Sequence, residues 1–401
     1  MMKKKVLKLF KYVPEDLKGI FLRQLLTVPD NFDEDIIFQL AQNENERIGA
    51  FSLVYECYLE TGSETPNKSK VRINPFLALP STQIIIAKHK DQIIGTLSII
   101  PNSSFGLPSN ERMDYEELIK KDFKIAELSS LAVKKNYRGN KGNIFFGLIK
   151  YAIELNSKHL NIDYIVTMIR KNKIDLYLHL MGFNYLIKDE IKGYKYSNFA
   201  NVYCLYLDIN MFPLWLYKHY GLKMRNKNLY NFFYKTNLKN FILPNSPYKI
   251  PNINRLTSKE INLLKITWKK KIKLLSKHQL IYLDYIYPDF SSKSFFSKNR
   301  KLNRAEVRFE LLHNGLIIDK NKSYKVSIKN ISPSGLKIFS ENMIETNKNY
   351  ILKVNLGDFD SSKLVISAVR KEADKNIYGL KILRSDNNWK NYFNFINQDA
   401  A

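Results

Sequence analysis

The chain has 401 residues, of which 45% are hydrophobic and 13% aromatic, so it is long enough for two or three domains with packed cores. No apolar run is long enough to cross a membrane, and the basic start lacks the features of a signal peptide. Cys57 and Cys204 lie in apolar surroundings, which predicts free buried thiols in a cytoplasmic protein. The six histidines have no metal-binding spacing, so no metal is expected.

The net charge of +26 is concentrated in the middle of the chain. Residues 214–300 contain 18 Lys and Arg but only 3 Asp and Glu. Such a basic field attracts an acidic protein, an anionic membrane or nucleic acid, although a solvated lysine-rich surface gives the same count. Because no nucleic-acid-binding motif is present, nucleic acid is the least favoured of these partners.

The N-terminal pattern predicts helices followed by a hairpin. Residues 1–35 are mixed and helical in character. A helix is expected over 43–60, where Asn43 and Glu46 resemble a capping box. Two β-rich runs, 83–88 and 93–100, are joined by a polar turn and predict a β-hairpin.

The next stretch predicts an anion-binding site. A strand over 125–133 leads through a glycine-rich basic turn into a helix over 144–156. A helix N-terminus presents free N–H groups and a positive dipole end, and glycines let a phosphate approach them. The turn supplies the candidate phosphate-binding residues Arg138, Gly139, Lys141 and Gly142.

A further strand over 164–168 and a short helix over 174–181 complete an order that resembles the GNAT acyltransferase superfamily. The ending Leu180-Met181-Gly182-Phe183 matches that family's usual ending. The segments 79–82, 105–109 and 126–133 more closely resemble the FeeM-like N-acyl amino acid synthases, which are related to acyl-homoserine lactone synthases. The resemblance spans about residues 40–210. It implies an enzyme that transfers a fatty acyl group from acyl carrier protein to an amino acid's amine.

Two positions depart from the family pattern. The glycine turn is one residue out of the usual register, and Ser130 stands where lactone synthases commonly have arginine. The weakened turn favours the single phosphate of a carrier's phosphopantetheine over the pyrophosphate of acyl-CoA.

Glu127 is the candidate general base, because N-acylation needs a neutral amine and a nearby carboxylate can take its proton. A glutamate inside an apolar strand is costly unless it is paired or functional. The alternative is therefore a structural Glu127 paired with Arg47 or Arg72. Arg47 is the candidate acceptor-binding residue, since its planar fork matches a carboxylate, although it could equally be a surface arginine.

A basic amphipathic helix is expected from Thr257, where Thr257 and Glu260 form a capping box. Ile261, Leu264 and Trp268 fall at helical spacing, with lysines mostly elsewhere. This helix could lie on a membrane, dock an acidic carrier protein, or pack its apolar face on one of the domains.

The C-terminal part predicts short strands over 307–312, 324–331, 335–339, 350–356, 364–371 and 379–383, a pattern typical of a small antiparallel barrel. It also contains an RxxxR pair, Arg304 and Arg308, followed by an NxSxxG run with Asn330, Ser332 and Gly335. These motifs resemble the PilZ domain, which implies cyclic di-GMP binding by these five residues. Gly335 would allow a positive φ or a close ligand approach. Asn303 and Asn330 depart from the strongest PilZ pattern.

Together these features predict an α+β GNAT-like acyltransferase domain, a basic helical linker and an all-β PilZ-like barrel. The expected boundaries are 1–35, 36–212, 213–298 and 299–395. The predicted function is a cyclic di-GMP-responsive N-acyltransferase that uses acyl carrier protein or acyl-CoA. The alternative is a non-catalytic cyclic di-GMP effector whose acyltransferase-like domain is an interaction module.

Overall fold

The structure, a computed structural model, describes residues 14–103, 105–115, 118, 123–139, 144–245, 255–269, 271–276, 279–280, 283, 286–287, 290, 309, 313–320, 322–357, 361–371 and 376–398. Within these ranges, no helix has the length and apolar character needed to span a bilayer. Buried residues between Leu26 and Phe290 form the cores of an N-terminal unit, and those between Phe309 and Ile396 form a separate core.

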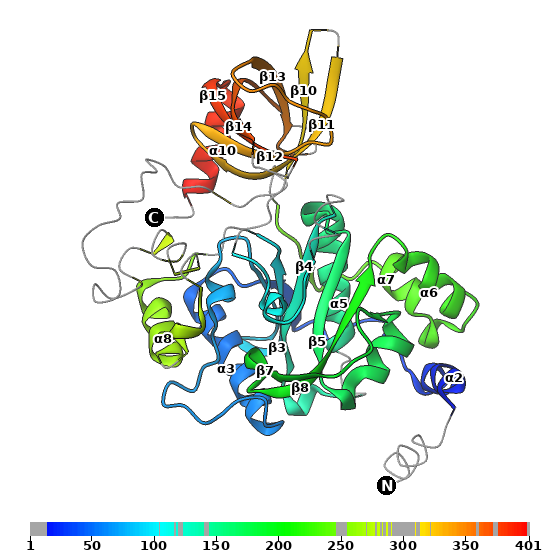
Figure 1. Cartoon of the computed structure of the whole chain (residues 1–401). Coiled ribbons are helices and arrows are strands. Elements are labelled where there is room, and N and C mark those ends of the chain that lie inside the picture. Colours follow the sequence, from blue (N-terminus) through cyan, green and yellow to red (C-terminus); the bar gives the residue numbers. More distant parts are fainter. Residues whose placement is uncertain are drawn as a thin grey trace.

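The N-terminal unit is built on one mixed β-sheet (Figure 1). Its strands are β1 (Ile36–Leu40), β2 (Gln83–His89), β3 (Gln92–Pro101), β4 (Ile125–Val133), β5 (Tyr164–Ile169), β6 (Asn184–Tyr185), β7 (Ile191–Tyr194), β8 (Ala200–Asp208) and β9 (Phe241–Ile242). The order is β6-β8-β5-β4-β3-β2-β1-β9, and β7 pairs with β8. Among the strands that the structure describes in this sheet, the pairs β4–β5 and β1–β9 are parallel and the others are antiparallel.

Both faces of the sheet are covered, because successive residues of a strand point to opposite faces. On β2, Ile85 joins the core that contains α5 (Ile144–Leu155), and Ile86 joins the core that contains α3 (Glu44–Glu60). We call these the α5-side core and the α3-side core. This two-sided burial explains the nearly continuous apolar sequence of the central strands.

Most local elements expected from the sequence are confirmed. The hairpin, the strand, the helix after the glycine turn and the following strand correspond to β2, β3, β4, α5 and β5. Asn43 caps α3 by accepting a hydrogen bond from the Glu46 amide at 3.0 Å. The opening segment contains α2 (Glu15–Leu25), whereas β1 was not expected.

The segment after residue 212 packs as part of the N-terminal unit and is not a separate linker. The helices α6 (Phe212–Tyr220) and α7 (Leu229–Tyr234) place Leu216 and Phe232 in the α5-side core. Strand β9 then extends the sheet beside β1. The expected boundary at 212 therefore falls inside a packed body, because Leu216 and Phe232 join the core on the α5 side of the sheet.

Helix α8 (Ser258–Trp268) begins at Thr257 with both halves of the predicted capping box. Its Ile261, Leu264 and Trp268 are buried in the α3-side core. Of the three fates left open by the sequence, this helix has the third: its apolar face packs on its own domain. The apolar face of α8 is therefore not available to a membrane or a carrier protein in this structure.

The C-terminal unit is a closed antiparallel barrel of six strands, in the order β10-β11-β12-β15-β14-β13 (Figure 1). These are β10 (His313–Asp319), β11 (Lys322–Ser332), β12 (Gly335–Phe339), β13 (Asn349–Asn355), β14 (Ser361–Lys371) and β15 (Ile377–Arg384), and α10 (Asn387–Gln398) follows. Trp389 and Tyr392 of α10 join the barrel core. The first described barrel strand is β10, which was not expected. The strand expected over 307–312 lies outside the described residues except for Phe309, which forms an isolated bridge with Ile331.

Candidate functional site

Glu127 is a buried carboxyl in the middle of the sheet. Its backbone pairs with Ile100 on β3 and with Val166 on β5, and its side chain is only 3% exposed. The Glu127 carboxylate accepts a hydrogen bond from the Ser109 amide at 2.8 Å. The two arginines offered as structural partners lie elsewhere: Arg47 bonds to Glu260 and Arg72 to Glu64. The alternative in which Glu127 forms a structural ion pair with Arg47 or Arg72 is therefore not observed.

Burial raises the pKa of Glu127 to about 7, although hydrogen bonds from Ser109 pull it in the opposite direction. Desolvation disfavours the charged form of a carboxyl, and here it outweighs the hydrogen bonds that favour that form. A carboxyl with this pKa exchanges its proton near neutral pH, which is the property required of a general base.

The Ser109 that bonds to this carboxyl is itself part of a cluster of polar side chains. The Tyr115 hydroxyl donates to the Ser109 Oγ at 2.8 Å and lies 3.7 Å from the Cys204 Sγ. Tyr194 is buried, and its hydroxyl has no hydrogen-bond partner among the residues that the structure describes. Burial and, after it, the Glu127 charge raise the pKa of Tyr194, which indicates that the two groups are close. Tyr194 is thus a free polar group beside Glu127.

Glu127 also lies where two strands separate. The parallel ladder between β4 and β5 covers only Ile125–Glu127 against Tyr164–Val166. Beyond it, the pairing of β4 with β3 is irregular, and Ser130 has a φ of 55°. The ladder therefore ends directly after the candidate base.

The phosphate-binding prediction is only partly within the described residues. Gly139 has a φ of 80° and open space beside it, and α5 begins at Ile144, after the turn. Lys141 and Gly142 lie outside the described residues.

Arg138 braces the glycine turn rather than pointing freely outward. It donates from Nε to the Val133 carbonyl at 2.6 Å, from Nη1 to Glu60 at 2.8 Å and from Nη2 to the Cys57 Sγ at 3.0 Å. In this structure the Arg138 guanidinium contacts α3 and β4, and its contact with a phosphate stays a prediction.

Arg47 is likewise committed to a partner within the chain. Its Nε and Nη2 each donate to the Glu260 carboxylate at 2.8 Å, and both side chains are buried. Glu260 also accepts from the Thr257 amide at 2.8 Å as part of the α8 cap. The Arg47 guanidinium, which was predicted to bind the acceptor's carboxylate, binds the Glu260 carboxylate instead. The acceptor-binding prediction for Arg47 is therefore corrected to a structural role.

Removing one member of this ion pair is expected to destabilise the protein strongly. Glu260→Ala would leave the Arg47 charge buried without its partner, a change that costs about 3–5 kcal/mol of unfolding free energy. Denaturant unfolding measures this loss. Arg47→Met combined with Glu260→Leu should recover much of it, since apolar residues of similar volume often replace buried pairs. A Glu260→Ala variant as stable as the wild type would contradict the assignment.

The second site is on the barrel. Asn330 and Ser332 belong to β11 and are buried, and the Ser332 hydroxyl donates to the Gly335 carbonyl at 3.2 Å. Gly335, the first residue of β12, is not among the residues with positive φ, so the alternative of close approach is the one left for this glycine.

The residue that follows the arginine motif pairs with this hairpin. Phe309 and Ile331 exchange backbone hydrogen bonds at 2.8 and 2.9 Å. Ile331 is flanked by Asn330 and Ser332, so the chain that leaves the arginine motif arrives directly beside the second motif. Arg304 and Arg308 themselves lie outside the described residues.

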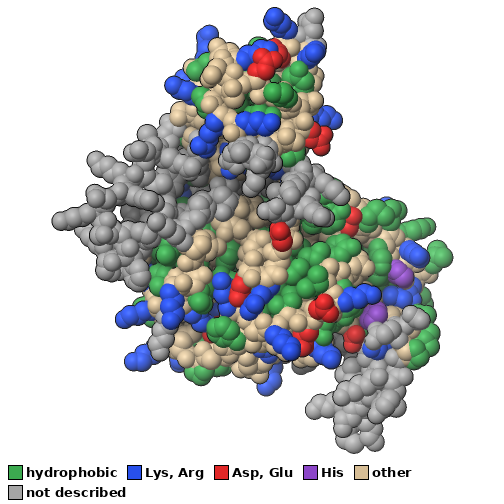
Figure 2. All heavy atoms as spheres, in the orientation of Figure 1, with side chains coloured by type: hydrophobic (Ala, Val, Ile, Leu, Met, Phe, Trp, Pro, Cys, Tyr) green, Lys and Arg blue, Asp and Glu red, His purple; other side chains and the backbone are tan. Residues whose placement is uncertain are grey.

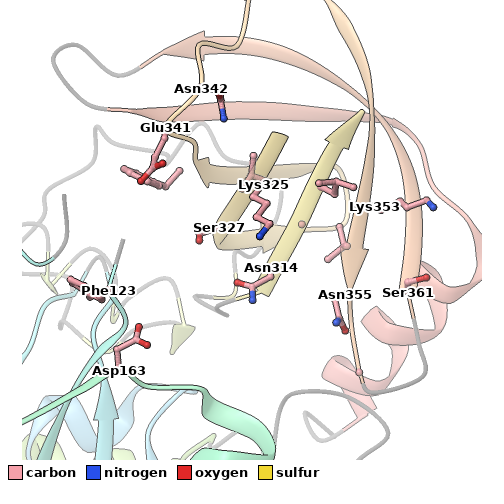
Figure 3. Close-up of a pocket in the computed structure, with 16 residues that line it drawn as sticks. Phe123, Asp163, Asn314, Lys325, Ser327, Glu341, Asn342, Lys353, Asn355 and Ser361 are labelled. Carbon is pink, nitrogen blue, oxygen red and sulfur yellow. The ribbon is translucent and has the colours of Figure 1, made fainter. Parts of the chain in front are cut away.

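A hollow of about 1100 Å³ lies elsewhere, between β10, β11 and β13 of the barrel and two residues of the N-terminal unit, Phe123 and Asp163 (Figure 3). Its charged lining residues are Lys325 and Lys353 on one hand and Glu341 and Asp163 on the other. This mixed lining selects neither an anion nor a cation, and none of the predicted site residues contributes to it.

Sequence reasoning missed Ser109, Tyr115 and Tyr194. Ser109 ends the segment 105–109, which carried the family resemblance, but nothing in that segment assigned it to Glu127. The tyrosines gave no signal, because the chain has 25 Tyr and 24 Phe and most aromatic residues fill cores.

Comparisons with known proteins agree with this division into two units. Residues 49–204 match the family model of the N-acyl amino acid synthase FeeM, and residues 302–393 match that of the PilZ domain. A search of curated proteins found no match.

Similar solved structures cover the two units separately. One is FeeM, an N-acyl amino acid synthase from uncultured soil microbes, at 22% identity over 45% of this chain and 93% of that chain, with a TM-score of 0.38. The AHL synthase LasI is 16% identical over 44% of this chain and 90% of that chain, with a TM-score of 0.33. The PilZ domain of YcgR from Escherichia coli, with c-di-GMP, is 12% identical over 24% and 92%, with a TM-score of 0.21. The chain thus contains a domain that matches the FeeM N-acyl amino acid synthase model and a C-terminal domain that matches the PilZ model.

Proposed function

We propose that the chain is a cyclic di-GMP-responsive N-acyltransferase, which moves a fatty acyl group from acyl carrier protein, or from acyl-CoA, to the amine of an amino acid. The observation that carries this proposal is the Glu127 carboxyl. It is buried, held by the Ser109 amide, has a pKa of about 7, and lies within the region that matches the synthase family. An amine is mostly protonated at neutral pH, so its acylation requires such a base.

In the proposed reaction, the acceptor's ammonium group first loses one proton to solvent. The neutral amine nitrogen then bonds to the carbonyl carbon of an acyl thioester as Glu127 takes a second proton from that nitrogen. The tetrahedral intermediate then loses its C–S bond, and the proton on Glu127 passes to the departing sulfur. The products are an amide and a free thiol, and Glu127 is again a carboxylate.

Direct transfer is favoured over an acyl-enzyme. Burial raises the pKa of Cys204, the thiol nearest to Glu127, to about 12, so that it remains protonated and is a poor nucleophile. The free hydroxyl of Tyr194 is suited to bind a polar atom of the substrate beside Glu127.

The carrier's phosphate is proposed to bind at the turn between β4 and α5. Gly139 gives backbone access, and the N-terminus of α5 follows. Lys141 and Gly142 remain the proposed contacts in this turn, while Arg138 fixes its position against Glu60.

Cyclic di-GMP is proposed to bind beside the β11–β12 hairpin. Arg304 and Arg308 would grip phosphate and guanine edges, and Asn330, Ser332 and Gly335 would shape the floor of the site. The support for this proposal is the Phe309–Ile331 bridge, because Phe309 directly follows Arg308 in the sequence and Ile331 lies between Asn330 and Ser332.

Purified protein given an acyl carrier thioester and an amino acid mixture should release an N-acyl amino acid, identified by mass spectrometry. The carrier-bound donor should be preferred to acyl-CoA, because the basic segment 214–300 attracts an acidic carrier protein. Its apparent association rate should fall as salt rises, whereas the rate with acyl-CoA should change less.

Equal use of both donors without salt dependence would contradict the carrier preference. Failure to form an amide from either donor, combined with measurable cyclic di-GMP binding, would favour the alternative of a non-catalytic effector.

A further inference from the structure

The helix α6 is apolar on its outer face as well as on its inner face. Phe212, Leu216 and Tyr220 point inward and are buried, as expected for a surface helix. On the outside, however, Met211 and Leu214 are more than half exposed, where a surface helix normally has polar residues. The inner face accounts for the fold, and the outer face contributes nothing to it.

The turn after α6 continues this exposed apolar surface. Leu222 is 98% exposed and Met224 is 75% exposed, so both side chains project from the molecule almost free of neighbours. Tyr217, on the preceding helical turn, is also exposed. We call Met211, Leu214, Tyr217, Leu222 and Met224 the α6 face.

Basic side chains accompany the α6 face. Lys218 and Lys223 alternate with its apolar residues, and the sequence contains no Asp or Glu from residue 209 to residue 259. Arg225 is paired with Asp30 at 2.8 Å, but no ion pair of Lys218 or Lys223 occurs among the described residues. Figure 2 shows hydrophobic and basic side chains side by side at the edge of the molecule that carries α6.

We propose that the α6 face binds an anionic phospholipid surface, with Leu222 and Met224 inserted among the lipids and the lysines at the headgroups. Aliphatic side chains beside lysine are the usual means by which a peripheral protein enters a bilayer interface. Anionic headgroups complement the basic residues of a segment that contains no Asp or Glu between residues 209 and 259.

The shape of the α6 face favours a membrane over a protein partner. A protein partner buries apolar anchors in pockets of fixed shape. Here the two most exposed side chains project from a convex turn, and a fluid lipid interface accepts such a shape without a complementary groove. This proposal requires neither acyl transfer nor cyclic di-GMP binding, and its test is independent of both.

Flotation of the full-length protein with vesicles tests the proposal. The protein should float with vesicles of equal parts phosphatidylcholine and phosphatidylglycerol, and at least tenfold less with phosphatidylcholine alone. High salt should weaken the binding, since the headgroup attraction is screened.

Two double variants separate the contributions. Leu222→Asp with Met224→Asp should lower binding at least tenfold, and Lys218→Glu with Lys223→Glu should remove the preference for phosphatidylglycerol. The matched controls are on the barrel: Met343→Asp, at an exposed apolar residue, and Lys322→Glu with Lys390→Glu. Both controls should bind as the wild type does, and thermal unfolding should be unchanged in all four proteins.

Wild-type protein that does not float with either vesicle would overturn the proposal. So would a Leu222 and Met224 variant that binds as well as the wild type. Self-association, or a complex with an acidic carrier protein, that is lost in this variant while vesicle binding is absent would assign the α6 face to a protein partner instead.

Discussion

Replacing Glu127 by glutamine is expected to lower the rate of amide formation by about 10²–10⁴-fold while the protein stays folded. Glutamine keeps the shape of the side chain and its hydrogen bond from the Ser109 amide, but it cannot accept a proton from the amine. The rate at which free thiol is released from the acyl thioester measures this loss. Near-wild-type turnover would remove Glu127 from the mechanism.

The pH dependence should identify the same group. Wild-type kcat/KM should rise as pH increases through about 7, because the carboxyl must be ionised to act as a base. This inflection should be absent from any residual activity of Glu127→Gln. The control Glu154→Gln changes a carboxyl on α5 that pairs with Lys150, and it should keep the wild-type profile.

Stability separates loss of chemistry from loss of fold. Burial raises the folded-state pKa of Glu127 from its ordinary value of 4.5 to about 7. The unfolded chain therefore ionises this group first, and the free energy of unfolding falls as the pH rises between these two values. Glutamine has no such cost. Glu127→Gln should therefore be at least as stable as the wild type at pH values above 7.

Replacing Arg304 and Arg308 together by alanine is expected to abolish cyclic di-GMP binding while basal acyl transfer continues. Two charge-assisted contacts of about 1.5–3 kcal/mol each correspond to a loss of affinity of about 10²–10⁴-fold. Titration calorimetry measures the binding. The control Arg384→Ala removes an exposed arginine at the end of β15 and should leave the affinity unchanged.

The wild-type result decides the broader question. If cyclic di-GMP gives neither heat nor a thermal shift with wild-type protein at high micromolar concentrations, the barrel has a structural role. If it binds, the rate of acyl transfer with and without ligand shows whether binding favours one arrangement of the two units over another.

The sequence predicted the elements whose signals are local. The capping box of Thr257 and Glu260, the hairpin around His89 and the strand–turn–helix around Gly139 all depend on residues a few positions apart. Each is present because short-range hydrogen bonding and alternation decide it.

The misses have long-range causes. Arg47 and Glu260 are 213 positions apart, and no spacing rule connects them. The pairing of β1 with β9 joins Phe38 to Phe241, so neither short strand is evident until the other is in place. Glu127 was predicted because burying an unpaired carboxylate in an apolar strand is energetically costly. The tyrosines near it could be identified only from the fold.

The packing of α8 defines the smallest part of the chain that can fold alone. The family model ends at residue 204, yet Glu260 neutralises a charge buried on α3, and Tyr287 donates to the Ala78 carbonyl at 2.7 Å. A fragment cut at residue 204 would leave Arg47 buried without its counter-ion and would expose the apolar surface that Trp268 covers. The independent folding unit therefore extends to about Phe290. The segment from α8 to Phe290 belongs to the N-terminal unit, and the barrel follows it in the chain.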